Sequence, residues 1–212
     1  MTLNSIAGLN IECYFSNDIG WAHKDELYQC KVESNLTITN PRTTITHASG
    51  RHLNGKSNEL VEIFYSYSPQ IVNYFPDGLD VLFPSLKAIF MGKVQLKEIH
   101  QADLKPFTEL EILYLEGNHI EYLERDLLKF NPKLRAFDAD LNRISYVYPE
   151  IFDNLSDLRF LHLNNIECVE DLGREDDDHA KVLEMITKMK ENCSIPSNRI
   201  ILEIFAYQSD FI

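Results

Sequence analysis

The stretch LEILYLEGN at residues 110–118 contains the pattern that decides the fold of this 212-residue chain. Its apolar residues alternate as they do in a strand with one face turned inward. The same phrase recurs every 24 residues, beginning at Leu86, Leu110, Leu134 and Leu158. A rougher copy begins at Val61, 25 residues before Leu86. The sequence therefore contains about five copies of one structural unit.

Agreement between the copies extends past the strand phrase to offsets 10, 13, 18 and 21. Over four complete copies and seven offsets, only Ser66 and Asn131 of 28 positions fall outside the apolar set, although the whole chain is 44% hydrophobic. A period of about 24 lies in the range of leucine-rich repeats. We expect an α/β fold: a short horseshoe-shaped solenoid with a parallel β-sheet on its concave face and an irregular or short-helical convex side.

An asparagine follows the strand phrase in two copies, at Asn118 and Asn142. Its side-chain amide is suited to pair with turn backbone groups that have no partner in the sheet. The other copies carry Pro69, Val94 and Ile166 at this offset. The asparagine ladder is therefore expected to be short, with different turn geometry at both ends.

The four cysteines form one pair near the start and one near the end: Cys13, Cys30, Cys168 and Cys193. This split favours two local disulfides that close the ends of the repeat array. No C-x-x-C motif occurs, which argues against zinc. Because disulfides persist in oxidising compartments, secretion is expected. Residues 1–10 lack a basic n-region and a full apolar core, so we expect the true leader to be missing or replaced.

Both ends of such an array need covering. Two strand-like runs within residues 11–33 predict an N-terminal cap. At the other end, Val182, Ile186, Met189 and Cys193 share one helical face, which predicts a docked helix. The expected organisation is a flank and cysteine cap at 1–60, repeats at 61–165, a helical disulfide cap at 166–193, and a tail without assigned role at 194–212.

N-glycosylation sequons begin at Asn35, Asn154 and Asn192. We expect modification at Asn35 and Asn154, whereas Asn192 stands beside a presumed disulfide. Twenty basic against 33 acidic residues give a net charge of −13, which disfavours nucleic acid and anionic membrane surfaces as partners. No apolar window is long enough to predict insertion into a membrane.

Stacking of the copies aligns equivalent strand positions into rows on the concave face. These rows are aromatic and apolar near the N-terminal copies and acidic near the C-terminal ones. Exposed rings are preferred in binding hot spots, whereas the alternative is that they only pack across strands. The candidate ligand-binding residues are Tyr65, Tyr67, Phe90, Ile112, Tyr114, Glu116, Asp138, Asp140, Phe160 and His162.

Together with the repeats, residues 13–15, 28–32, 45–52, 55–58 and Val61 resemble the cysteine-containing flank of secreted leucine-rich-repeat proteins of flies of the mosquito and midge kind. The likeness covers about residues 12–193. It implies an extracellular, non-enzymatic recognition protein, and some relatives act in haemolymph immunity. Immune members typically add a C-terminal coiled coil, a feature that this sequence does not show.

Three patterns compete with this interpretation. Residues 50–57, GRHLNGKS, match the G-x-x-x-x-G-K-[ST] phosphate-binding motif, but a strand-like run follows where the motif needs a helix. Asp138, Asp140 and His162 invite a catalytic interpretation, yet no nucleophile motif accompanies them, and His162 is expected at the surface. The acidic run at 167–178 lacks the ligand spacing of a calcium loop.

We therefore expect no enzyme, no cofactor and no metal site. The hypothesis is a secreted recognition protein that binds another protein, or a surface glycan, through its concave face. The alternatives are an ectodomain fragment of a receptor or an extracellular structural protein, and more remotely a nucleotide-binding enzyme acting through residues 50–57.

Overall fold

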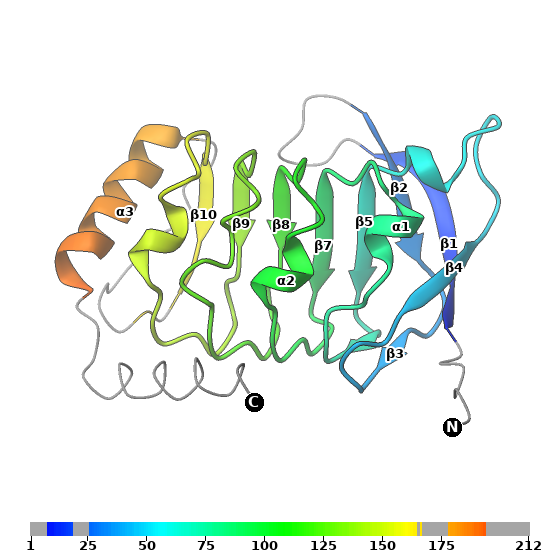
Figure 1. The fold of residues 1–212 in the computed structure, drawn as a ribbon, viewed down its shortest axis with the longest axis horizontal. Coiled ribbons are helices and arrows are strands. Elements are labelled where there is room, and N and C mark those ends of the chain that lie inside the picture. Colours follow the sequence, from blue (N-terminus) through cyan, green and yellow to red (C-terminus); the bar gives the residue numbers. More distant parts are fainter. Residues whose placement is uncertain (1–7, 19–25, 165, 167–177, 194–212) are drawn as a thin grey trace, which may run out of the picture.

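A computed structural model of the chain describes residues 8–18, 26–164, 166 and 178–193. An eight-stranded sheet runs through most of this part in the order β10-β9-β8-β7-β5-β2-β1-β4 (Figure 1). One strand comes from each repeat: β5 (Ile63–Tyr67), β7 (Ala88–Gly92), β8 (Ile112–Tyr114), β9 (Ala136–Asp138) and β10 (Phe160–His162). These five strands pair in parallel, as the strand phrase predicts.

The register of the sheet follows the sequence period. Equivalent inward residues lie directly opposite one another on neighbouring strands: Phe64, Ile89, Leu113, Phe137 and Leu161. All five side chains are fully buried in the main core. Burial of a side chain of this size contributes about 1.5–3 kcal/mol, so a shift of register would expose the chain's main source of stability.

Short helices cover one face of the sheet, the face that carries the inward residues of the core (Figure 1). They are the single-turn helices α1 (Leu79–Leu82) and α2 (Gln101–Leu104) and the 3-10 helix η2 (Pro149–Phe152). Asn131, one of the two polar exceptions in the apolar pattern, is fully buried on this side. Its Nδ2 donates to the carbonyls of Leu104 at 3.0 Å and Phe107 at 2.8 Å, so it links its own repeat to the preceding one.

The amide of Asn118 satisfies four backbone groups in the turn after the strands. Its Oδ1 accepts from the N–H groups of Val94 and Leu96, both at 3.0 Å. Its Nδ2 donates to the carbonyls of Met91 at 2.7 Å and Leu115 at 2.8 Å. Because the side chain is buried, water cannot replace these bonds. This role agrees with the one predicted from the repeat.

Asn142 repeats this arrangement one unit later, with Oδ1 accepting from the N–H of Ile120 at 3.0 Å and Nδ2 donating to the carbonyl of Leu115 at 2.9 Å. Toward the N-terminus the structure continues the ladder with a residue that the sequence does not predict. Buried Gln70, next to Pro69, accepts from the N–H of Leu36 and donates to the carbonyl of Val32. Its longer side chain reaches backbone groups of the flank.

The flank enters the repeat sheet. Strands β1 (Leu9–Asp18) and β2 (Leu27–Val32) form an antiparallel pair, and β2 pairs in parallel with β5. Strand β4 (Ile45–Ser49) pairs in parallel with β1. Strands β3 (Thr37–Ile38) and β6 (Ile71–Val72) make a separate two-stranded sheet.

A disulfide joins Cys13 to Cys30 across β1 and β2, at a sequence separation of 17. A cross-link over such a loop contributes about 3 kcal/mol by limiting the unfolded chain. This bond is one of the two that the cysteine positions predict. The other predicted bond involves Cys168, which lies outside the described residues.

At the far end, helix α3 (His179–Asn192) packs against β10 and η2. Asp178 caps it by accepting from the N–H groups of Ala180 and Lys181. Val182, Ile186 and Met189 are buried on one face, as their spacing predicts. The helix is also tied by Lys190, whose Nζ lies 2.6 Å from Asp153 Oδ1.

Some expectations fall on residues that the structure does not describe: the leader at 1–10 in part, most of the acidic run at 167–178, and the tail at 194–212. The domain boundaries stay predictions, although the sheet passes without a break from the flank into the repeats. Asn35 and Asn154 are exposed, as glycosylation would require.

Replacing Asn118 by Ala should lower the free energy of unfolding by about 3 kcal/mol, because four buried backbone groups lose their partner. Urea denaturation measures this effect. Exposed Thr108→Ala is the control and should change stability by less than about 0.5 kcal/mol. Equal denaturation midpoints for the two variants would contradict the structural role of Asn118.

Candidate functional site

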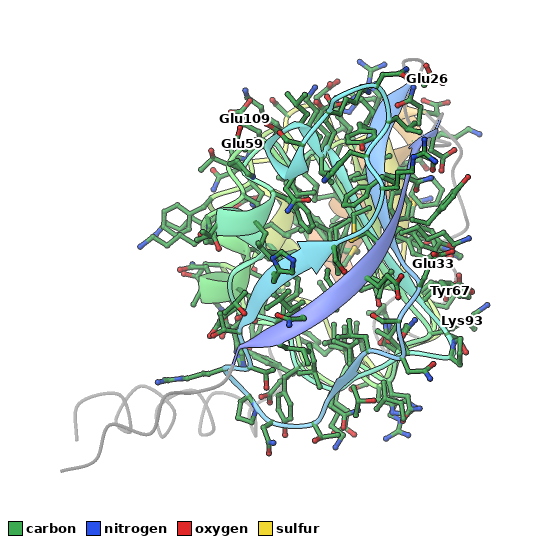
Figure 2. All side chains as sticks on the ribbon, turned by 90° about the vertical axis from the view of Figure 1, so that its right-hand side faces the viewer. Glu26, Glu33, Glu59, Tyr67, Lys93 and Glu109 are labelled. Carbon is green, nitrogen blue, oxygen red and sulfur yellow. A yellow bond between two sulfur atoms is a disulfide. The ribbon has the colours of Figure 1, made fainter. Side chains whose placement is uncertain are left out.

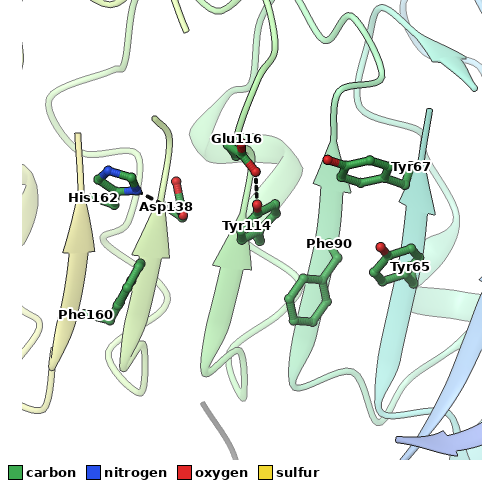
Figure 3. A pocket seen from close by; sticks show the side chains of 8 residues that line it. All are labelled: Tyr65, Tyr67, Phe90, Tyr114, Glu116, Asp138, Phe160 and His162. Carbon is green, nitrogen blue, oxygen red and sulfur yellow. Dashed lines mark hydrogen bonds and ion pairs between the residues drawn. The ribbon is translucent and has the colours of Figure 1, made fainter. Parts of the chain in front are cut away.

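The strand residues between the inward ones point to the face of the sheet opposite the core, which we call the open face. Strand pairing aligns one row on this face: Tyr65, Phe90, Tyr114, Asp138 and His162. The row is aromatic over β5, β7 and β8 and polar over β9 and β10. The gradient predicted from the repeats is therefore present on neighbouring strands (Figure 3).

The aromatic side chains form a continuous file. Ring centroids are 6.1 Å apart between Tyr67 and Tyr65, 5.8 Å between Tyr65 and Phe90, and 5.6 Å between Phe90 and Tyr114. Neighbouring rings are inclined by 23–36°. These distances lie in the range of favourable aromatic pairs, which contribute about 0.5–1.5 kcal/mol each. The rings therefore hold one another in place along the face.

A second row of residues forms the base on which the rings rest. It consists of Ile63, Ala88, Ile112, Ala136 and Phe160, all buried in a small apolar cluster apart from the main core. Tyr65 and Tyr114 pack against this cluster. Ile112 is only 1% exposed, which corrects its assignment as a ligand contact. It supports the rings because the neighbouring side chains of the open face cover it.

The open face contains a pocket of about 390 Å³. Eight of the ten candidate residues line it, and Figure 3 shows them together: Tyr65, Tyr67, Phe90, Tyr114, Glu116, Asp138, Phe160 and His162. Ile112 and Asp140 are not among the lining residues. The volume is that of a pocket for a small ligand or a single side chain.

The acidic end of the pocket surrounds His162. Its Nδ1 lies 3.4 Å from Asp138 Oδ2, and its Nε2 lies 3.4 Å from Asp140 Oδ2. Both aspartates are 5% exposed, and Asp138 Oδ1 accepts from the N–H of Asp140 at 3.0 Å. Burial raises the pKa of Asp138 above its usual value, since water no longer solvates the charge. The sequence analysis expected His162 at the surface. In the structure its side chain is only 16% exposed and lies between the two carboxylates.

This arrangement lacks the parts of a hydrolytic triad. None of the eight lining residues is a serine, threonine or cysteine, so His162 has no such nucleophile beside it in the pocket. Within the described residues, no group of three His, Cys, Asp or Glu side chains is arranged to hold a metal ion. The lining side chains are suited to contact and charge pairing.

Two residues that sequence reasoning missed shape the aromatic end. Lys93 Nζ lies 5.6 Å from the ring centroid of Tyr67 and 3.3 Å from Glu116 Oε1. Interactions with Tyr67 and Glu116 raise the pKa of Lys93. Figure 2 shows Tyr67 and Lys93 close together at one edge of the molecule. Glu116 also accepts a hydrogen bond from the Tyr114 hydroxyl.

Gly92 is the second missed residue. A Cβ at this position would lie 2.6 Å from Tyr67 Cε2 and 2.9 Å from Tyr114 Cε1. The missing side chain therefore leaves space for both rings over the backbone of β7. The signal in the sequence is a glycine at the end of a strand phrase, which often marks a close approach of another group.

The segment at residues 50–57 does not have the surroundings of a phosphate site. The 3-10 helix η1 (Asn58–Leu60) of three residues follows it, where the motif needs a full helix. Lys56 Nζ donates to Asn17 Oδ1 at 3.0 Å and lies 4.2 Å from the ring centroid of Tyr28. The lysine therefore packs on the flank.

A second groove, of about 480 Å³, follows the turns after the strands. Its charges neutralise one another: His100 Nδ1 lies 2.8 Å from Glu124 Oε1, and Arg143 Nη1 lies 3.6 Å from Glu121 Oε1. The hydrogen bond with Glu124 is the main cause that raises the pKa of His100 to about 9. The pair joins neighbouring repeats, and the groove is the weaker candidate for a ligand site.

Comparison with known proteins agrees with the repeat geometry. Residues 108–165 match the family described as Leucine rich repeat. This match supports a leucine-rich-repeat protein and points to an interaction domain without catalytic activity. No curated protein matches the chain. Among the helices that the structure describes, none has the length and apolarity needed to cross a membrane.

Gly92→Ala should displace the rings of Tyr67 and Tyr114 and lower the free energy of unfolding by about 1–2 kcal/mol, because the site has no room for a methyl group. Near-ultraviolet circular dichroism follows the rings, and urea denaturation gives the stability. Gly55→Ala is a poor control because Gly55 has a positive φ. Exposed Thr108→Ala is suitable instead. An unchanged aromatic spectrum in Gly92→Ala would contradict the close approach.

His100→Gln should lower the free energy of unfolding by about 1 kcal/mol at pH 6. The effect is small because the His100 side chain is 50% exposed, so solvent screens its interaction with Glu124. A folded pKa of about 9 against 6.5 means that the stabilisation is complete below pH 6.5 and is lost as the pH rises toward 9. Urea denaturation at pH 6 and pH 9.5 should therefore show a loss only at the lower pH. Equal losses at both values would exclude the charged pair with Glu124 as the cause.

Proposed function

We propose that the chain is a secreted, non-catalytic recognition protein that binds a protein partner through its open face. Leucine-rich repeats suggest a protein–protein interaction module in general. The observation that carries the more specific proposal is the continuous file of Tyr65, Phe90 and Tyr114 beside a carboxylate cluster in one pocket. Aromatic anchors in a central pocket are typical of interface hot spots.

The Cys13–Cys30 disulfide supports an extracellular location, since such bonds persist in oxidising compartments. The exposed asparagines of two sequons, Asn35 and Asn154, are compatible with it. In this proposal the repeats stack as a solenoid, the β1–β2 pair and helix α3 cap its ends, and the open face is its concave side. A receptor ectodomain would use the same surface.

The test replaces the three rings while keeping apolar side chains. The variant Tyr65→Leu, Phe90→Leu, Tyr114→Leu removes the ring faces but leaves the base row covered, which limits the loss of stability. A matched control alters three exposed apolar residues away from the open face, as Leu60→Ala, Val81→Ala, Leu183→Ala. Circular dichroism and thermal melting confirm that both variants are folded.

Each immobilised protein is incubated with extracellular fluid of the source organism, and retained proteins are quantified by mass spectrometry. A defined partner should be retained by the wild type and the control at least about tenfold better than by the ring variant, since hot-spot losses exceed about 2 kcal/mol. Purified partner must then reproduce this difference in direct binding. If every retained protein binds the ring variant equally well, the open face is not the binding site.

A further inference from the structure

The pocket of the open face combines the partly exposed rings of Tyr65 and Tyr114, with the nearly buried ring of Phe90 between them, and an excess of carboxylates. This combination defines a ligand chemistry. We propose that the pocket receives the guanidinium group of an arginine side chain from the protein partner. This inference rests on the proposed function, because the partner supplies the arginine. Three features carry it: the arrangement of the rings, the charges around them, and a cation of the chain itself that is already bound at the rim.

The rings favour a flat cation. Tyr65, Phe90 and Tyr114 follow one another on adjacent strands, tilted by 34–36°, and do not enclose a point as a cage would (Figure 3). A planar guanidinium can stack along such a file, whereas a compact ammonium is better suited to a closed cage. Ring faces therefore select arginine over lysine here.

The charges favour a cation over a neutral group of the same shape. Glu116 and Asp138 line the pocket, and Asp140 lies behind them against His162. Asp140 Oδ1 is buried without a hydrogen-bond partner in the described structure. Lys93 contacts Glu116, and His162 lies 3.4 Å from a carboxylate oxygen of both Asp138 and Asp140. A bidentate guanidinium would satisfy carboxylate oxygens and reduce the repulsion among them.

Lys93 already places a positive group of the chain itself against this surface. Its ammonium lies over Tyr67 and beside Glu116, so it contacts a ring and a carboxylate at once. The lysine is 45% exposed and occupies only the rim. An incoming arginine would compete with it for Glu116. Removal of the Lys93 charge should therefore strengthen binding of a cation while leaving binding of a neutral analogue unchanged.

Size and long-range charge agree with this ligand. A pocket of about 390 Å³ is large enough for one side chain and too small for a folded segment. The net charge of −13 attracts a basic partner and speeds its association. The local and global electrostatics therefore favour the same ligand.

The experiment titrates the full chain, labelled with ¹³C in its Tyr and Phe rings, with N-acetyl-argininamide, N-acetyl-lysinamide and N-acetyl-citrullinamide. Citrulline retains the planar shape of arginine but carries no charge. Arginine should shift the ring signals of Tyr65, Phe90 and Tyr114 and bind at least about tenfold more tightly than citrulline. Lysine should bind with intermediate affinity.

Charge variants distinguish specific recognition of the guanidinium group from non-specific binding to the protein surface. Glu116→Gln with Asp138→Asn keeps the shape of the pocket and should abolish the preference for arginine over citrulline. The single variant Glu116→Gln changes only a residue at the rim and should reduce that preference. It provides the test if the double variant is unstable. Lys93→Met should increase the affinity for arginine about threefold without affecting citrulline.

The matched control is Glu59→Gln with Glu109→Gln, which removes two exposed carboxylates at an edge of the molecule far from Tyr67 and Lys93 (Figure 2). This variant has the same net charge as the double pocket variant. It should retain the arginine preference. Equal loss in both double variants would mean that only overall charge acts, and would overturn the proposed pocket.

The outcomes also distinguish this inference from the proposed function. If a partner requires the three rings but argininamide neither shifts them nor competes with that partner, the inference is wrong and the function stands. Equal binding of arginine and citrulline has the same consequence. Selective binding of argininamide without any ring-dependent partner would overturn the proposed function, and with it the partner as the source of the arginine.

Discussion

Each repeat of this chain is incomplete alone, and hydrogen bonds between neighbouring repeats are the constraint on which the structure depends. A single repeat buries its inward residues only when another repeat lies on each side. The backbone groups of its turns also depend on the next repeat: Asn118 reaches back to Val94 and Leu96, and Asn131 reaches back to Leu104. These bonds are possible only at a fixed offset between repeats.

The same offset produces the open face. Because strands pair without a shift, Phe90 and Tyr114 stand opposite one another, and Asp138 stands opposite His162. A displacement by one residue would bring inward leucines to this face and bury the rings. The surface that could bind a partner is thus a consequence of the pairing that stabilises the core. Its charge gradient follows the order of the repeats along the chain.

The period of 24 residues was sufficient to predict the parallel sheet, the inward residues and the role of Asn118. The buried face of helix α3 followed from the helical spacing of its apolar residues. The ten candidate residues were found from strand alternation, and eight of them line one pocket. Alternation tells which side of a sheet a residue occupies but not how deeply it is covered. For this reason Ile112 could not be distinguished from Tyr114, although the first lies beneath the rings and the second among them.

Other features depend on contacts that no periodic pattern reports. Lys93 lies one residue beyond the strand, and its position over Tyr67 depends on side-chain conformation. Gln70 replaces asparagine in a turn whose sequence departs from the repeat, because a longer side chain is needed to reach Leu36 of the flank. The parallel pairing of β1 with β4 joins segments about 37 residues apart without any repeated motif.

The disulfide-linked strands at the N-terminal end belong to the same sheet as the repeats, so their outward residues continue the open face. Lys31 on β2 places its Nζ 5.6 Å from the ring centroid of Tyr65. The disulfide-linked pair of strands thus borders the file of rings. If the open face binds a partner as proposed, substitutions on the outward side of these two strands would change the border of the binding surface without any change in the repeats.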